Sequence, residues 1–584
     1  MFRILRFLKK YWWAAILAPL FMVGEVAMDF MITNQMKLLI DNGIQSNDIE
    51  AVKTIGLTML FYLAIGVSCG ILSGVFANIA STGYANDLRK SLFGKIMKLS
   101  YDQTDDFSTA SLVTRVTNDV TQMQNFVGQM IRMFVRSGGM FVLGIIFTVN
   151  IDVRFSIILA IVLPIEVIAM LIFMKKTFPV FSIIQKKLDK VNTVVHENVT
   201  GARVVKAFCK EDYEEKRFNE VNGSFSNTLL GVSKIFSLMM PIFMLLVYAA
   251  QIAIYSIGGN DIFNSINSNQ APTVSIGEIS QATMYVVMIC FALMQFGMMF
   301  SSMASASASA KRINAVLDCP LEIVDGNLDV SALKEVGTVE FKDVSFAYPN
   351  ANGNVLENLN FRINKGETVA IVGATGSGKS TLVNLITRFY DVTGGEVLVD
   401  GVNVKEYKQV DLRDKISIAL QKSELFAGSI KDNILWGKPD ATDEEVIEAA
   451  QIAQAEEFIL SKHDKYDEFV EEKGTSLSGG QKQRLSIARA IIKKPEILIF
   501  DDSSSALDLV TEAKLYKAMK EKINDTTRIV VAQRVATAKN ADKIIVLDGG
   551  SIIAYDTHEN LLNNCEVYQD IYNSQLKREG DFYG

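Results

Sequence analysis

The stretch Gly474–Asp508 reads GTSLSGGQKQRLSIARAIIKKPEILIFDDSSSALD. It begins with a serine- and glycine-rich turn, continues as a basic helical run, and ends with the apolar strand Ile497–Phe500 and the aspartates Asp501 and Asp502. A glycine-rich turn at the start of a helix presents backbone N–H groups to an anion. Aspartates at the end of an apolar strand are typical positions for holding the magnesium of a nucleotide. This stretch therefore predicts a protein that handles a nucleoside triphosphate.

An upstream motif, GATGSGKS at Gly373–Ser380, completes the predicted phosphate site. It matches G-x-x-x-x-G-K-[ST], and it lies between an apolar strand, Val369–Val372, and a predicted helix, Ser380–Phe389. We predict that Lys379 bridges the outer phosphates and that the Ser380 hydroxyl ligates magnesium. The alternative is a glycine-rich turn without a ligand, which would not need this strand–turn–helix context. The residues predicted to contact the nucleotide are Gly373, Ala374, Thr375, Gly376, Ser377, Gly378, Lys379, Ser380 and Thr381.

The composition differs between the two halves of the chain. Residues 1–310 contain long apolar runs, whereas residues 337–584 have the composition of an ordinary soluble domain. A chain of 584 residues is too long for one domain. Its net charge of −7 argues against nucleic-acid binding, which usually requires a basic face. The five cysteines lack metal-binding spacing, which predicts packed thiols in a reducing compartment.

Six apolar stretches in the N-terminal half are long enough to cross a bilayer. The third is short, because Arg132 and Arg136 occupy the positions where it would continue. We therefore expect this helix to have a long cytoplasmic extension. The predicted spans lie near Trp12–Met31, Ile55–Ile79, Met140–Val149 with its flanks, Phe155–Phe173, Leu229–Ile257 and Ile279–Met303.

The placement of lysine and arginine predicts the orientation of these spans. Segments 1–10, 82–125 and 175–228 are rich in both residues, whereas segments 41–50 and 258–278 contain neither. We therefore expect a multi-pass protein of the cell (plasma) membrane with both termini in the cytoplasm. The long inner segments have helical periodicity, which predicts that they continue the spans.

From Gly337 onward, short apolar strands alternate with helical runs, which is typical of an α/β domain. The predicted architecture is a six-span all-α transmembrane domain at residues 1–318, a linker at residues 319–336, and an α/β P-loop nucleotide-binding domain at residues 337–584. The predicted strands are Thr338–Phe341, Val344–Tyr348, Thr368–Val372, Ile416–Leu420, Ile497–Phe500, Arg528–Val531 and Lys543–Leu547.

The order of these motifs resembles that of an ATP-binding cassette. Tyr348 precedes the phosphate loop, Gln421 follows a strand, and the LSGGQ turn at Leu477–Gln481 precedes Asp501 and the segment Ser505–Asp508. With six spans ahead of them, the chain resembles a half-transporter of the ABC exporter type along essentially its whole length. In that family two cassettes meet head to tail, and each ATP lies between the phosphate loop of one subunit and the LSGGQ of the other.

The resemblance implies a role for individual residues. Tyr348 would stack on the adenine, although a lone strand tyrosine is more often simply packed. Gln421 would contact magnesium and the attacking water, and Asp501 would hold magnesium. The residues that would contact the ATP of the partner subunit are Ser478, Gly480 and Gln481.

The resemblance also predicts contacts between the membrane half and the cassette. The segments Ser108–Asp119 and Val195–Phe208 are similar to the short coupling regions that touch the cassettes, and Glu472 would face them. The alternative is that these segments are the surface of helices in long loops.

Two residues depart from the family pattern. The glutamate that normally follows the first aspartate, and acts as the general base, is Asp502 here; the histidine of the later switch region is Gln533. Aspartate is one methylene shorter and reaches the water poorly, and glutamine cannot carry a proton. Both changes together predict the degenerate half of a heterodimeric exporter. In this interpretation Asp502, Gln533 and Gln421 form a slow hydrolytic site, and the intact signature completes the partner's site.

The membrane half contains weaker signals about the substrate. Glu25 and Asp29 share one face of the first span, and Glu166 lies inside the fourth. Charges within a bilayer tend to face a wet cavity, which would suit cationic amphiphiles; contacts between helices are the alternative. The last two spans are rich in methionine, which is common at promiscuous surfaces and is also ordinary membrane filler.

These patterns predict an ATPase coupled to transport, using ATP and Mg²⁺, that pairs with a second half-transporter and exports amphipathic compounds, including drugs. Two alternatives remain open. One is a homodimeric lipid or peptide exporter. The other is a nucleotide-sensing membrane subunit that regulates another protein and transports nothing.

Overall fold

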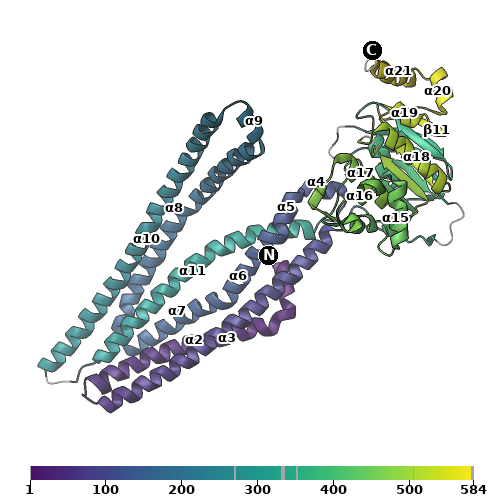
Figure 1. The fold of residues 1–584 in the computed structure, drawn as a ribbon. Coiled ribbons are helices and arrows are strands. Elements are labelled where there is room, and N and C mark those ends of the chain that lie inside the picture. Colours follow the sequence, from purple (N-terminus) through teal and green to yellow (C-terminus); the bar gives the residue numbers. More distant parts are fainter. Residues whose placement is uncertain are drawn as a thin grey trace. The chain divides into compact units, whose positions relative to one another are not determined.

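The chain forms two compact units in its computed structural model. One contains Met1–Met97 and Thr109–Cys319, and the other contains Lys98–Ser108 and Pro320–Gly584. The first is helical, whereas the second combines helices with three β-sheets (Figure 1). The structure describes residues 2–268, 271–330, 336–349, 351, 353–503 and 506–580.

Six helices in the described part of the first unit are long and apolar enough to cross a membrane, which confirms the predicted transmembrane fold. The third span is one run, Thr109–Ile151, which continues through two π-helical segments. The spans are formed by α2 (Trp12–Leu38), α3 (Ile49–Ile96), α5 (Thr109–Thr114) through α6 (Val120–Gln129) to α7 (Val135–Ile151), α8 (Val153–Thr200), α10 (Glu211–Asn267) and α11 (Ile276–Leu317).

Large apolar side chains on these helices face outward. On α3, Leu57, Leu60 and Phe61 are 72%, 63% and 62% exposed. A helix satisfies its own backbone hydrogen bonds, so it can lie in lipid. The large apolar exterior is also stable in lipid, whereas it would be unfavourable in water. Figure 1 shows α2 beside α3, and α8 beside α10 with α9 (Ala202–Ala207) joining them.

Polar side chains cap the spans where they begin. Asp48 accepts hydrogen bonds from the backbone of α3, and Asp152 does so for α8. Ser275 and Glu278 form a reciprocal capping box at the start of α11. These contacts satisfy backbone donors that a helix leaves unpaired, and they explain why the spans begin at these residues.

The second unit contains a mostly parallel six-stranded sheet, which confirms the predicted α/β domain. Strands β11, β3, β10, β9 and β6 run parallel, and β12 pairs antiparallel with β11. All five residues of β9 are buried, as expected for a strand covered on both faces. The strands in sheet order are β12 (Ser551–Asp556), β11 (Lys543–Asp548), β3 (Thr368–Val372), β10 (Thr527–Val531), β9 (Ile497–Asp501) and β6 (Ile416–Ala419).

A second sheet is antiparallel and was only partly predicted. Its first strand, β1 (Val339–Phe346), joins two strands predicted separately, because β-bulges interrupt its pairing. The prediction missed β2 (Leu356–Ile363), β4 (Gly394–Val399) and β5 (Val402–Asn403), as well as β12 in the parallel sheet. The missed strands alternate buried with exposed residues or begin at glycines, so their apolar signal is weak.

Part of the predicted linker is hydrogen-bonded to the second unit. The Gly326 and Leu328 N–H groups donate to the carbonyls of Tyr407 and Glu406, each over 3.0 Å. The Asp325 carboxylate accepts from the Gln409 backbone over 2.9 Å. This stretch is therefore held as an additional edge of the domain.

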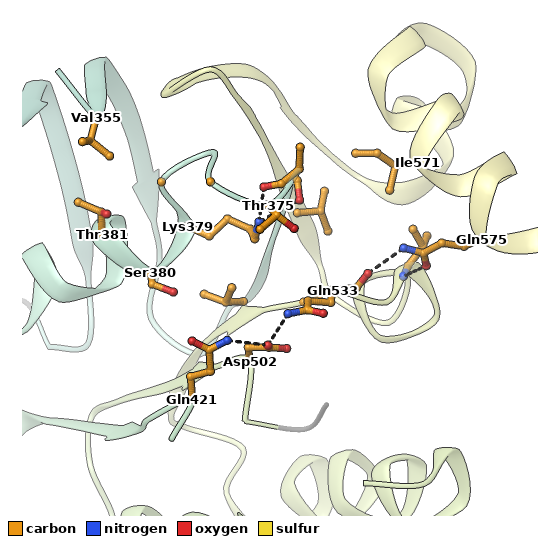
Figure 2. Close-up of a pocket in the computed structure, with 18 residues that line it drawn as sticks. Val355, Thr375, Lys379, Ser380, Thr381, Gln421, Asp502, Gln533, Ile571 and Gln575 are labelled. Atoms are coloured by element: carbon orange, nitrogen blue, oxygen red, sulfur yellow. Dashed lines mark hydrogen bonds between the residues drawn. The ribbon is translucent and has the colours of Figure 1, made fainter. Parts of the chain in front are cut away.

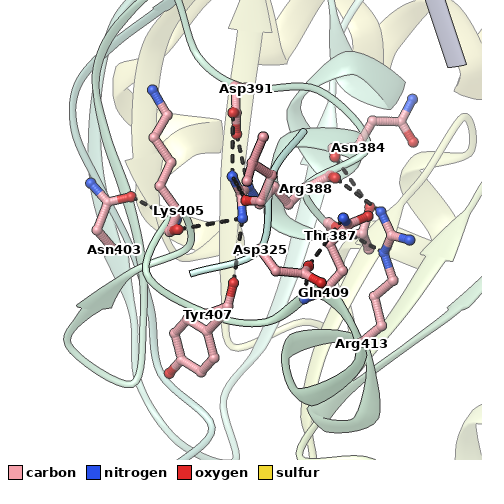
Figure 3. A network of polar contacts seen from close by, with 11 residues as sticks. Asp325, Asn384, Thr387, Arg388, Asp391, Asn403, Lys405, Tyr407, Gln409 and Arg413 are labelled. Carbon is pink, nitrogen blue, oxygen red and sulfur yellow. Dashed lines mark hydrogen bonds and ion pairs between the residues drawn. The ribbon is translucent and has the colours of Figure 1, made fainter. Parts of the chain in front are cut away.

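One buried arginine connects this stretch to the domain (Figure 3). The Arg388 guanidinium donates to the Asp391 carboxylate over 2.9 Å and to the carbonyl of Val324 over 3.0 Å. It also donates to the carbonyls of Lys405 and Tyr407, each over 3.4 Å. Arg388 is 3% exposed. The three N–H donors of a lysine are on one nitrogen, which could not serve these four acceptors together.

We expect Arg388→Ala to destabilise the second unit by roughly 2–3 kcal/mol, because it leaves buried acceptors without a donor. Thermal unfolding of the full-length protein in detergent measures this as a lower melting temperature. Arg362→Ala, which removes a surface ion pair with Glu340, is the control and should cost less than about 1 kcal/mol. Equal effects of the two substitutions would contradict this account of Arg388.

Candidate nucleotide-binding site

The carboxyl ends of four parallel strands converge on one cavity. The phosphate loop follows β3, Asp502 follows β9, Gln533 follows β10, and Gln421 follows β6. Ligands of open α/β sheets bind beyond the carboxyl ends of the strands. These residues line a cavity of 490 Å³ (Figure 2).

The phosphate loop has a conformation that requires glycine. Gly376 and Gly378 have φ of +85° and +97°, in the left-handed region. A Cβ at Gly378 would lie 2.6 Å from a methyl carbon of Leu356. The loop leads into α12 (Lys379–Ile386), whose first N–H groups are available to an anion.

The Lys379 ammonium lies against its own loop. It donates to the carbonyls of Gly373 and Ala374 over 2.9 and 2.7 Å. Burial lowers the pKa of Lys379, while the nearby Asp502 and Asp501 oppose this shift. A partly buried cation beside exposed N–H groups is suited to binding phosphate oxygens.

An oxygen donor set suited to magnesium lies beside the loop. The Ser380 hydroxyl donates to Oδ1 of Asp501 over 2.8 Å, and Gln421 lines the same cavity. Burial raises the pKa of Asp501, and the Ser380 hydrogen bond lowers it. The described residues contain no cluster of three or more His, Cys, Asp or Glu suited to a metal. The set of one carboxylate, one hydroxyl and one amide fits Mg²⁺, which commonly uses one or two carboxylates together with substrate phosphates. When bound, Mg²⁺ would neutralise phosphate charge.

Two amide side chains contact the carboxylate of Asp502. Nε2 of Gln421 donates to Oδ2 over 3.2 Å, and Nε2 of Gln533 donates to the same oxygen (Figure 2). Asp502 has φ of +50°, a conformation that aspartate tolerates better than most residues. Burial raises the pKa of Asp502, whereas the hydrogen bond from Gln421 and the charge of Lys379 lower it.

The C-terminal helix α21 (Glu566–Gly580) holds the Gln533 segment from behind. Nε2 of Gln575 donates to the Gln533 carbonyl over 2.7 Å, and its Oε1 accepts from the Val535 N–H over 2.8 Å. Ile571 of the same helix also lines the cavity. The contact between Gln575 and the Gln533 segment was not predicted, because Gln575 belongs to no sequence motif.

Most of the predicted phosphate-loop and hydrolytic residues meet at this cavity. Asp501 and Ser377 do not line it, although Asp501 is bonded to Ser380. Tyr348 stands beside it, with its hydroxyl 3.1 Å from Oγ1 of Thr381, so adenine stacking stays a prediction. Ser505 lies outside the described residues. The predicted residues that line the cavity are Gly373, Ala374, Thr375, Gly376, Gly378, Lys379, Ser380, Thr381, Gln421, Asp502 and Gln533.

The signature turn lies apart from this cavity. Ser478 caps α17 (Gly479–Ile491) in a reciprocal capping box with Gln481. Ser478 and Gly479 are exposed, and a Cβ at Gly479 would meet no atom within 4 Å. The described residues that line the phosphate-loop cavity do not include Ser478, Gly480 or Gln481. The exposed N-terminus of α17 is therefore not part of this cavity.

A short helix from the membrane half groups with the second unit. This helix is α4 (Tyr101–Phe107), and its Tyr101 ring lies 4.8 Å from that of Phe389. The side chain of Gln103 donates to the Pro320 carbonyl over 2.6 Å. We predicted coupling segments at Ser108–Asp119 and Val195–Phe208; Ser108 groups with the second unit and Thr109 with the membrane helices, and the coupling role of both segments stays a prediction. The helical continuity of the region concealed the break at Ser108.

Six membrane helices followed by a phosphate-loop domain with an LSGGQ turn define an ATP-driven membrane transporter. Residues 15–293 match the family model for the ABC transporter transmembrane region, and residues 356–505 match that for the ABC transporter. The chain is 36% identical over 578 residues to an uncharacterized ABC transporter ATP-binding protein of Bacillus subtilis, covering 99% of each chain.

Two other relatives have more specific names. A putative multidrug export ATP-binding/permease protein of Bacillus subtilis is 32% identical, with 98% of this chain and 99% of the relative covered. An ATP-dependent lipid A-core flippase of Syntrophus aciditrophicus is 31% identical, with 96% and 93% covered. A solved bacterial Atm1-family ABC exporter has the same fold, with a TM-score of 0.78 at 23% identity over 97% of this chain and 98% of that one.

The chain therefore belongs to the ABC transporter family. It is a half-transporter of the exporter type, a multi-pass membrane protein whose ATPase domain is coupled to transport.

Lys379 provides a test of the cavity. We expect Lys379→Ala to weaken ATP binding roughly ten- to a hundredfold, because a charged hydrogen bond contributes about 1.5–3 kcal/mol. Binding of a fluorescent ATP analogue to the purified transporter measures the effect. Lys365→Ala, on a turn before β3, is the control and should bind normally. Normal binding by Lys379→Ala would exclude this cavity as the nucleotide site.

Proposed function

We propose that the chain is the hydrolysis-impaired subunit of a heterodimeric ATP-driven exporter of amphipathic compounds, drugs among them. Its phosphate loop binds ATP, and its signature turn completes the competent site of a related partner subunit. Binding of two ATP molecules brings the cassettes together and opens the cavity outward. Hydrolysis in the competent site resets the transporter.

The setting of Asp502 carries the proposal. In ATP hydrolysis a general base takes the proton of the water that attacks the γ-phosphorus. The oxygen of Asp502 that accepts from Gln421 and Gln533 already receives two hydrogen bonds. An oxygen engaged in this way is less available to a water, and the short aspartate side chain reaches a water poorly. Both features support slow hydrolysis in this chain's own site.

The separation of the signature turn supports pairing with a second cassette. Ser478 and Gly479 are exposed at the N-terminus of α17, away from the lining of the chain's own cavity. An exposed helix N-terminus attracts the phosphates of a ligand bound elsewhere. The intact turn and the altered Asp502 therefore favour unlike subunits, each completing the other's site.

The arrangement in the membrane follows from the charge pattern. We infer that the exporter lies in the plasma membrane. Both of its termini face the cytoplasm, because the segments on that side are basic. Arg154, at the outer ends of the spans, is paired with Asp152 and Asp261 and adds little to the positive charge there. We also infer that α4 transmits movement of the cassette, since Tyr101 packs on Phe389.

Substitutions at Asp502 test the assignment in the purified heterodimer. We expect Asp502→Ala to reduce total ATPase activity much less than alanine at the corresponding glutamate of the partner, which should cost about 10²–10⁴-fold. The double substitution Asp502→Glu, Gln533→His should raise activity, because it restores a longer base and a group that carries protons.

The signature turn provides the matched comparison. Gly480→Asp should abolish the partner's hydrolysis, since it places a negative charge where phosphates bind. Loss of all activity in Asp502→Ala, with activity retained when the partner's base is removed, would overturn the assignment. Full activity of the chain without a partner would favour a homodimer. ATP binding without transport of any amphiphile into vesicles would favour a nucleotide sensor.

A further inference from the structure

Three acidic residues lie within the apolar stretches predicted to cross the membrane, and two of them have a charged partner. The Arg136 guanidinium on α7 lies 2.8 Å from Glu25 and 3.6 Å from Asp29, both on α2. This contact between helices accounts for Glu25 and Asp29, the alternative left open by the sequence. Neither has to be explained by a substrate.

Glu166 on α8 has a different environment. It is 3% exposed, and in the described part of the chain no cation pairs with it and no N–H or O–H donates to its carboxylate oxygens. The thiol of Cys290 on α11, a weak donor, lies beside it. A buried carboxyl group without a strong partner is costly, so a membrane protein that keeps one usually uses it.

The side chain of Glu166 lines a cavity of 420 Å³ between α8, α10 and α11. An adjoining cavity of 400 Å³ shares Met170, Phe173, Met239 and Met294 with it. Methionine side chains adapt to apolar ligands of varied shape. The faces of aromatic rings attract cations. Among the described residues that line the two cavities, Glu166 is the one acid, Lys176 and Thr177 are the other polar members, and the rest are apolar or glycine.

We propose that this space binds hydrophobic monocations, with Glu166 pairing with the charged group and the methionine-rich walls enclosing the apolar body. The inference rests on the proposed export function and names its substrate class. One carboxyl group without a cationic partner among the described residues matches one positive charge, and a bound cation favours its ionised form. Anions are disfavoured, because in a medium of low dielectric constant they are repelled by Glu166.

The other charge on the cavity wall is compatible with this assignment. Lys176 is exposed and lies ten residues beyond Glu166 on α8, about 15 Å along a helix. Among the described residues, its ammonium forms no hydrogen bond or ion pair with Glu166. A ligand therefore meets the carboxylate at one place and apolar walls elsewhere.

The test compares tetraphenylphosphonium with its isosteric anion, tetraphenylborate, and with uncharged triphenylphosphine oxide. Binding to the purified full-length transporter, with its partner subunit where one co-purifies, is measured by scintillation proximity. We expect saturable binding of the cation, weakened at least tenfold by Glu166→Gln and largely retained by Glu166→Asp. Binding of the uncharged probe should change little in Glu166→Gln.

Two further variants control for folding and position. Glu220→Gln, on the exposed surface of α10, should bind the cation normally. Met239→Trp fills both cavities and should weaken binding of the cation and of the uncharged probe alike, with Glu166 intact. Elution volume and ATP binding show whether each variant is folded.

The outcomes separate this inference from the proposed function. Equal cation binding by the wild type and Glu166→Gln, or tighter binding of tetraphenylborate, would overturn the inference. ATP-driven transport of the uncharged probe without any cation binding would overturn it too and leave the exporter assignment standing. Cation binding that depends on Glu166, but without ATP-driven transport of any probe, would support the site and overturn the exporter assignment.

Discussion

Parallel pairing of β3, β10, β9 and β6 is the constraint on which the ATPase domain depends. These strands are apolar and buried on both faces, so their side chains hold them in register and leave chemistry to the loops that follow. In-register pairing carries Asp501 beside Val531, and Val531 beside Ile371. The phosphate loop, the aspartates and Gln533 are far apart in sequence, yet they meet because each comes directly after one of these strands.

The polar contacts in the cavity show how neutral side chains satisfy a buried carboxylate. Gln421 and Gln533 give Asp502 hydrogen bonds but no charge, so they satisfy the acid without gaining or losing a proton themselves. Gln575 then fixes the Gln533 backbone. A histidine at position 533 could take up or release a proton near neutral pH, whereas glutamine keeps the same reach as a neutral donor.

The sequence predicted those parts of the structure in which one short segment contains the whole signal. The phosphate loop, the parallel strands and the capped α17 are of this kind. The antiparallel strands β2 and β4 were missed because tertiary pairing, and not local pattern, makes them strands. The grouping of α4 with the cassette depends on the aromatic contact of Tyr101 with Phe389, between residues far apart in the chain. The contact of Gln575 was likewise invisible, since no spacing rule connects it to Gln533.

The pairing of the acids within the membrane spans likewise depends on residues far apart in the chain. In the sequence, Glu25, Asp29 and Glu166 are equivalent signals, because each is a carboxylate in an apolar span. Arg136 lies 111 residues from Glu25 along the chain, so only the folded helices show which acids it pairs with. A paired acid contributes to holding α2 against α7. Glu166 also pays a desolvation cost, but no cation among the described residues offsets it. This difference distinguishes the cavity at Glu166 from the paired acids on α2.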